Sequence, residues 1–291
     1  MEDVTGDSLE ARIAWHVEKI LLTQDAEGMI PSYITVSDSI DRKKDIVRQS
    51  MANMALMFAQ QLVPTLDIQK QINLSERYVQ DNLESQTPIQ KLYIMLYTAL
   101  AEAYAKKEVS IALVHQALVP DMLSHPIAVG LYLRLSGLLP KPLPHTTYLQ
   151  EVLRYNLCLA PRQGRFFDYA DTLVWAKSAA PELAQQEYQY LESCYTADGW
   201  FKDLHTGVRA WSSPVGKVFE VLAYYAADAA LVERLYTRLL HERATSHYAK
   251  QTLGKYHEHI LSQPNTLYID DVHMHVLVGL CYLLADKQKN V

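Results

Sequence analysis

Three aspartates stand at matching positions in repeated turn segments, where they could carry acid–base chemistry. Each follows the residue that opens its turn by four positions, with an aromatic side chain midway: Gly164, Phe166 and Asp168; Gly199, Phe201 and Asp203; Thr266, Tyr268 and Asp270. Cleavage of a glycosidic bond needs one carboxylic acid to protonate the leaving oxygen and a second carboxylate to activate water or attack directly, roughly 5 to 10 Å away. The pattern predicts Asp168, Asp203 and Asp270 as catalytic residues.

The same three positions also suit a structural role. An aspartate just before a helix is a frequent N-cap, worth about 1 kcal/mol, and an aspartate in a turn often accepts hydrogen bonds from its own backbone. Both interpretations remain open from the sequence.

Aromatic and cationic side chains in or beside the turns are candidates for contact with a ligand. Aromatic faces stack on sugar rings and cations, and an arginine can form two parallel hydrogen bonds to a carboxylate. Packing between hairpins and solvation at the surface are the structural alternatives. The candidate binding residues are Trp200, Trp211, Tyr169, Tyr268, Arg48, Arg209 and His273.

Adjacent acids and a His-x-His pattern occur together in Asp270-Asp271-Val272-His273-Met274-His275. Two imidazoles and a carboxylate could bind a divalent metal ion. Residues two apart on a helix, however, point to different sides. We therefore expect His273 and His275 not to share a site, and we expect no metal and no cofactor.

Several classes of chemistry lack their sequence requirement. The chain has no Gly-rich phosphate loop, no G-x-S-x-G and no H-E-x-x-H, which argues against nucleotide hydrolysis, serine-hydrolase chemistry and zincin chemistry. The net charge of −6, with no stripe of Lys and Arg, argues against a nucleic-acid partner. Three widely spaced cysteines in apolar runs predict buried thiols rather than disulfides: Cys158, Cys194 and Cys281.

The elements that must position these residues are predicted to be helices. Only 10 glycines occur among 291 residues, and 49% of the residues are hydrophobic, which favours an all-α fold over a turn-dense sandwich or barrel. No Pro/Gly/Ser-rich linker divides the chain, so residues 1–291 are expected to form a single domain.

Apolar periodicity predicts about twelve helices, or six hairpins. More polar helices (9–23, 183–196 and 249–261) alternate with more apolar ones (50–62, 215–227 and 272–284). Such alternation fits hairpins closed into a ring, with the apolar helix of each hairpin facing the centre. The other predicted helices cover residues 78–83, 89–105, 109–118, 127–139, 149–159 and 171–180.

An open array is the weaker alternative to a ring. The interval from Gly164 to Gly199 is close to that of a tetratricopeptide repeat, but the next one, from Gly199 to Thr266, is nearly twice as long. The Trp, Gly, Tyr and Pro landmarks of that repeat are also missing.

Short motifs resemble a known group of closed rings. Asp198-Gly199-Trp200-Phe201 after a helix, and Trp211-Ser212-Ser213 opening an apolar helix, are similar to the repeat of α/α-toroid (six-hairpin glycosidase-like) proteins, nearest in kind to unsaturated glucuronyl hydrolases. Gly28-Met29-Ile30-Pro31-Ser32-Tyr33 and Arg48-Gln49-Ser50 are similar to first hairpins of such rings. The resemblance extends over about half the chain. It implies an (α/α) toroid with a cavity where the inner helices begin, and relatives that include glycoside hydrolases, sugar epimerases, polysaccharide lyases and prenyl cyclases.

Two functions therefore stand as expectations. The first is a carbohydrate-active or carbohydrate-binding toroid, a glycoside hydrolase or sugar epimerase acting on a small saccharide or similar polar ligand. The second is a non-catalytic helical scaffold that binds a protein partner. Prenyl-cyclase chemistry ranks low, because only Asp270-Asp271 represents its clustered aspartates. The acidic N-terminus and the lack of an apolar run of about 18 residues predict a cytoplasmic protein without a membrane span.

Overall fold

Helices dominate the structure, as predicted. The computed structural model describes residues 8–36, 40–109, 125–160, 165–179, 181–197, 201–207, 213–225, 228–241, 244–246, 249–251 and 266–289. Within these ranges the eleven α-helices are α1 (Leu9–Leu22), α2 (Ile46–Leu62), α3 (Gln69–Asn82), α4 (Pro88–Tyr104), α6 (Pro126–Leu138), α7 (Thr146–Leu159), α8 (Thr172–Ala179), α9 (Pro181–Ser193), α10 (Ser213–Tyr224), α11 (Ala229–His241) and α13 (Asp270–Lys289).

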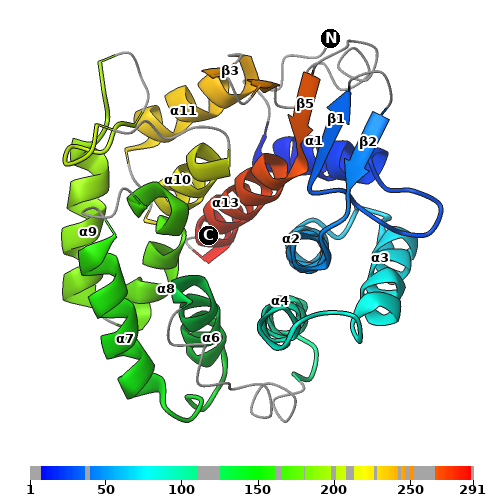
Figure 1. Ribbon diagram of the computed structural model, residues 1–291, viewed down its shortest axis with the longest axis horizontal. Coiled ribbons are helices and arrows are strands. Elements are labelled where there is room, and N and C mark those ends of the chain that lie inside the picture. Colours follow the sequence, from blue (N-terminus) through cyan, green and yellow to red (C-terminus); the bar gives the residue numbers. More distant parts are fainter. Residues whose placement is uncertain are drawn as a thin grey trace.

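Six of these helices contact one another in sequence order. Helix α2 packs on α4, α4 on α6, α6 on α8, α8 on α10 and α10 on α13, and α13 packs back on α2. In Figure 1 these six helices lie toward the middle of the molecule. We call them the inner helices.

The other helices pack outside the inner ones. Helix α1 lies against α13, α3 against α2, α7 against α6, α9 against α8 and α11 against α10 (Figure 1). Along the described chain, outer and inner helices alternate from α1 to α4 and from α6 to α11.

Local sequence signals fix where several helices begin. Ser8 caps α1 and Asp45 caps α2, each by accepting hydrogen bonds from backbone N–H groups in the first turn. Thr87 and Gln90 form a capping box at the start of α4, with Pro88 as its first helical residue. These side chains satisfy N–H groups that have no partner inside a helix.

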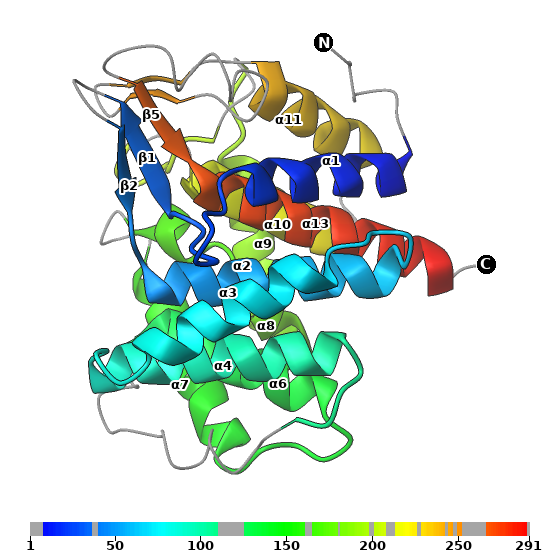
Figure 2. The ribbon, with the colours of Figure 1, turned by 90° about the vertical axis from the view of Figure 1, so that its right-hand side faces the viewer.

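A small antiparallel sheet lies at one end of the helices (Figure 2). Its strand order is β2-β1-β5, with β1 at Tyr33–Val36, β2 at Ile40–Lys43 and β5 at Thr266–Ile269. Strand β2 leads into α2 and β5 leads directly into α13, so the sheet marks the end where these two inner helices begin. A second antiparallel pair joins β3 (Ala244–Ser246) to β4 (Ala249–Gln251).

Glycines allow the inner helices to approach closely. A β-carbon on Gly130 of α6 would lie 1.9 Å from Cε3 of Trp175 on α8, and one on Gly279 of α13 would lie 2.8 Å from Cε1 of Phe219 on α10. Both contacts are shorter than packed atoms allow. The large aromatic rings on the neighbouring helices fill the space that the two glycines leave.

Two expectations about the last third of the chain are wrong. Residues 249–251 form strand β4 rather than the start of a helix over 249–261, and the remainder of that range lies outside the described residues. The helix that packs outside α10 is instead α11, whose apolar residues recur at helical spacing but were not recognised: Leu231, Val232, Leu235, Tyr236, Leu239 and Leu240. The helix predicted over 109–118 falls almost wholly outside the described residues.

No helix among the described residues is long and apolar enough to cross a membrane.

Candidate functional site

Polar side chains gather where the inner helices begin. Tyr93 of α4 is the best-described centre of this group, because it interacts with residues at the starts of α2, α6 and α8. Contact among residues at or near the starts of four helices means that these helices run in the same direction. We call the group the helix-start cluster; its members are Arg48, Tyr93, His125, Tyr169 and Asp171.

Burial raises the pKa of Tyr93 to about 12. Electrostatic interactions with Tyr169 and Asp171 add to this rise, whereas a hydrogen bond from the backbone of Ala128 and the charge of Arg48 oppose it. The Tyr93 ring also meets the ring of His125 edge to face, with centroids 6.3 Å apart. Tyr93 therefore carries its proton at neutral pH and can donate it in a hydrogen bond.

A buried carboxylate–imidazole pair joins α10 to α13. Nδ1 of His275 lies 2.8 Å from Oε2 of Glu220, and both residues are under 5% exposed. A carboxylate at Nδ1 holds the proton on that nitrogen and fixes the ring, the arrangement that general acid–base catalysis uses. Gly216 makes the approach possible, since a β-carbon there would lie 3.1 Å from Cβ of His275.

His273 lies on a different side of α13 from His275. Its Nδ1 is 2.8 Å from Nδ1 of His16 on α1, and Nε2 of His16 is 3.3 Å from the hydroxyl of Tyr236 on α11. The expectation that the two imidazoles of the His-x-His pattern face apart is confirmed. His273, predicted to bind substrate, instead contributes to the packing of α1 and α11 on α13.

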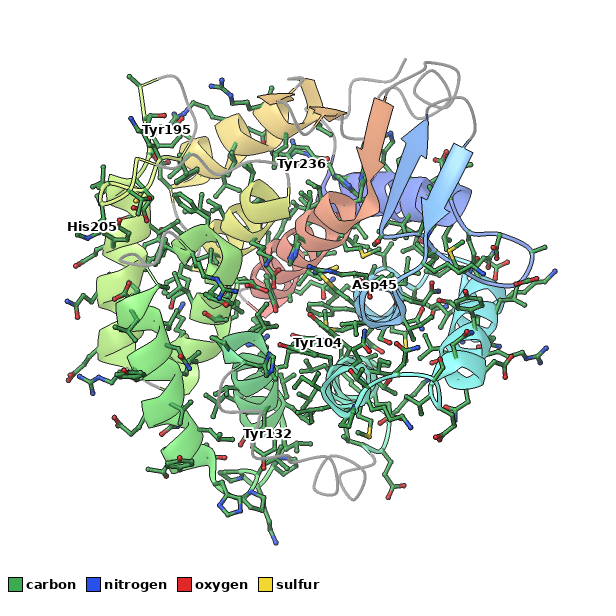
Figure 3. All side chains as sticks on the ribbon, in the orientation of Figure 1. Asp45, Tyr104, Tyr132, Tyr195, His205 and Tyr236 are labelled. Carbon is green, nitrogen blue, oxygen red and sulfur yellow. The ribbon has the colours of Figure 1, made fainter. Side chains whose placement is uncertain are left out.

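Asp203 serves its own loop in this structure. Its Oδ1 accepts hydrogen bonds from the backbone of His205 and from the backbone and hydroxyl of Thr206. Asp203 lies close enough to Tyr190 and Cys194 of α9 to affect both electrostatically, and His205 lies at the periphery beside α9 (Figure 3). The structural alternative for this aspartate, a turn residue, accounts for its contacts.

The other two predicted aspartates take different places relative to their helices. Asp168 lies in a short 3-10 helix, Phe166–Tyr169, that precedes α8, and Asp270 is the first residue of α13. Asp203 precedes α10 by ten positions, so the three do not share one structural position. The side chains of Asp168 and Asp270 lie outside what the structure describes.

The predicted binding residues divide in the same way. Arg48 and Tyr169 belong to the helix-start cluster, which agrees with a place near the inner-helix starts. Tyr268 lies in β5, but its side chain is outside the described set. Trp200, Trp211 and Arg209 are outside the described residues.

Glu220, His275 and Asp171 are the polar residues of this region that the turn pattern missed as site residues. Glu220 interrupts the apolar run Val218-Phe219-Glu220-Val221-Leu222. A lone carboxylate inside an otherwise apolar helix is a signal that it has a partner in the interior, because burying an unpaired charge is costly. That signal was available from the sequence.

Metal and disulfide sites are both absent from the described part of the chain. No group of three or more His, Cys, Asp or Glu side chains there could hold a metal ion. Cys194 and Cys281 are buried free thiols, and burial raises the pKa of Cys194 to about 11. The side chain of Cys158 lies outside the described set.

Comparison with known proteins adds no relative. No family model matches the chain, and no curated protein and no solved structure matches it.

Proposed function

We propose that the chain is a six-hairpin (α/α) toroid that acts on a small acidic or neutral saccharide at the helix-start cluster. The observation that carries the proposal is the buried Glu220–His275 pair on two neighbouring inner helices. In this proposal the pair acts together with Arg48, Tyr93 and Asp171, which gather where α2, α4 and α8 begin.

The order of helix contacts supports the toroid. Each inner helix packs on the next, and α13 packs on α2 as well as on α10. An open stack of hairpins would leave its first and last members apart. In this proposal α11 and α13 form the last hairpin, and the sheet covers the end where the inner helices begin.

The chemistry proposed is proton transfer at a saccharide. His275, oriented by Glu220, exchanges a proton with a sugar hydroxyl, ring carbon or glycosidic oxygen, while Tyr93 donates a hydrogen bond. Arg48 binds a carboxylate where the saccharide is a uronate. A positioned acid or base of this kind accelerates a reaction by about 10² to 10⁴-fold.

The three aspartates predicted from the turns have different roles in this proposal. Asp168 and Asp270 stay candidates for a second acid, because α8 and α13 begin beside the cluster. Asp203 is proposed to order its loop, given its three local hydrogen bonds.

Carboxyl-to-amide substitution tests the proposal. Wild-type protein, Glu220→Gln and the control Glu233→Gln would be assayed against a panel of glucuronides, glucosides and free uronates, with product formation followed by NMR. Glu233 is a suitable control because it pairs with Arg12 away from the inner helices. We expect Glu220→Gln to lose about 100-fold or more in turnover and Glu233→Gln to keep it.

If no turnover is observed, a measurement of saccharide binding distinguishes a carbohydrate-binding toroid from a protein scaffold. Saccharide binding that Glu220→Gln weakens would support a carbohydrate-binding toroid. No binding to any member of the panel would refute the proposal and favour the protein scaffold.

A further inference from the structure

Each of the six inner helices contributes one side chain to a second cluster. Its members are Phe58, Tyr104, Arg134, Lys177, Tyr224 and Tyr282, and we call it the tyrosine–cation cluster. The Phe58 and Tyr104 rings stack with centroids 4.1 Å apart. Tyr104 and Tyr224 are the last residues of α4 and α10, so this cluster lies toward the opposite end of the helices from Tyr93. Figure 3 shows Tyr104 pointing toward the middle of the inner helices.

Arg134 lies at the centre of this cluster. Its guanidinium carbon is 5.7 Å from the ring centroid of Tyr104, 5.0 Å from that of Tyr224 and 5.2 Å from that of Tyr282. Nε donates to the hydroxyl of Tyr104 and Nη1 to the hydroxyl of Tyr224, each at 3.0 Å. The Tyr104 and Tyr282 hydroxyls are 3.2 Å apart.

Hydrogen-bond donors outnumber acceptors in the cluster. A guanidinium has five N–H groups and each tyrosine has one O–H. Within the described part of the chain, only two guanidinium N–H groups and one of the three tyrosine hydroxyl hydrogens have an acceptor. In particular, the hydroxyl of Tyr224 accepts from Arg134 and its own hydrogen points to no described acceptor.

Two positive charges also lie close together there. Nζ of Lys177 lies 5.2 Å from the centroid of the same Tyr224 ring that Arg134 covers. Among the described residues no carboxylate pairs with Arg134 or Lys177. Glu220 interacts electrostatically with Tyr282, but its carboxylate is hydrogen-bonded to His275 rather than to Arg134 or Lys177. The C-terminal ends of α4 and α10 favour nearby cations, but they accept no bond from the spare donors.

Neither cation is fully enclosed by the described residues. Lys177 is exposed and Arg134 is only partly buried. A small oxyanion would complement both the excess of donors and the two like charges, since its oxygens only accept hydrogen bonds.

We propose that the tyrosine–cation cluster binds an oxyanion group, a carboxylate or a phosphate, of a small ligand. Arg134 and Lys177 supply the charge, and the Tyr224 hydroxyl supplies a hydrogen bond. Arg134, Lys177 and Tyr224 have no part in the proposed saccharide chemistry, so the test of this site does not depend on the saccharide proposal.

Calorimetric titration with two simple anions tests this site. Wild-type protein would be titrated with inorganic phosphate and with acetate, at an ionic strength held constant with chloride. The anion that binds with the higher affinity identifies the preferred oxyanion group. We expect saturable binding that Lys177→Gln and Tyr224→Phe each weaken about fivefold to tenfold, because each loses one charged or hydrogen-bonding contact. Lys91→Gln is the matched control, since Lys91 pairs with Glu84 on the surface, and it should bind as wild type does.

NMR of Arg134 and the affinities of the variants show whether the anion binds at this cluster. The Nε–H resonance of Arg134, followed by NMR in the wild-type protein, should shift as the anion saturates the site. The proposal would be overturned if neither anion binds saturably. It would also be overturned if the Arg134 resonance does not shift while heat is released. Equal affinity in Lys177→Gln, Tyr224→Phe and wild type would overturn it as well, and the cluster would then serve only to close the ends of the inner helices.

Discussion

At the scale of single residues, α13 contributes one histidine to each of two buried networks, one proposed to be catalytic and one structural. His275 faces α10 and pairs with Glu220, whereas His273 faces α1 and pairs with His16. The second network also includes Arg12, whose guanidinium covers the Tyr236 ring at 4.7 Å and pairs with Glu233. It ties α1, from the start of the chain, to α11 and α13, from its end.

His16 should make the stability of the protein depend on pH. Burial, with Arg12 as a second cause, lowers the pKa of His16 from 6.5 to about 3. The unfolded chain therefore binds a proton between these values that the folded protein does not. The stabilisation is complete above pH 6.5 and falls by about 1.4 kcal/mol per pH unit as the pH drops toward 3.

Urea unfolding at several pH values between 7 and 4 measures this dependence. His16→Asn should lower the unfolding free energy at pH 7, because it removes the bonds to His273 and Tyr236, and should also flatten its pH slope. His205→Asn, at an exposed histidine outside this network, is the matched control for the loss of one imidazole. A slope that His16→Asn does not change would show that His16 is not the titrating group.

At the scale of elements, the closest contacts between inner helices depend on glycine. Gly130 receives the Trp175 ring of α8 at a distance that leaves no room for a β-carbon. Helix propensity alone would favour alanine there by about 1 kcal/mol. Packing decides the balance in the opposite direction, because inserting a methyl into a filled interface forces side chains or backbone to move.

Gly130→Ala should therefore destabilise the protein by about 1 to 3 kcal/mol. Gly137, exposed on the same helix, is the matched control: Gly137→Ala should be neutral or slightly stabilising. Thermal unfolding of the two variants against wild type measures the difference. Equal stability of both variants would mean that α6 and α8 are not packed as closely as the structure has them.

The helices could be predicted from the sequence far better than the site. Periodic apolar residues gave the positions of α1, α4, α7 and α13 to within a few residues, because a helix with one buried face repeats its pattern locally. The turn pattern predicted the same structural position for Asp203 as for Asp168 and Asp270, and that prediction is wrong. The turn segments are similar in sequence, but loops of different length separate them from the helices that follow. The partners Glu220 and His275 are 55 positions apart, so only the packing of α10 on α13 brings them together.

At the scale of the whole molecule, α13 packs on α2 as well as on α10, so the first and last of the described inner helices are neighbours. The helix-start cluster lies toward the end where β2 and β5 lead into α2 and α13, whereas Tyr104 and Tyr224 end α4 and α10 at the other. We propose ligand chemistry for the Glu220–His275 pair and for the two clusters. The network of His16, His273 and Tyr236 joins α1 and α11 to α13 from outside and has a structural role.

Histidine NMR tests this division most directly, because the two kinds of histidine lie two positions apart on one helix. The imidazole resonances of selectively labelled protein would be followed while glucuronate, and separately glucose, is added. The account predicts that His275 shifts, together with His125, while His273 and His16 stay in place. Shifts confined to His273 and His16, or no shift of His275 at saturating saccharide, would contradict the proposed ligand site at the Glu220–His275 pair.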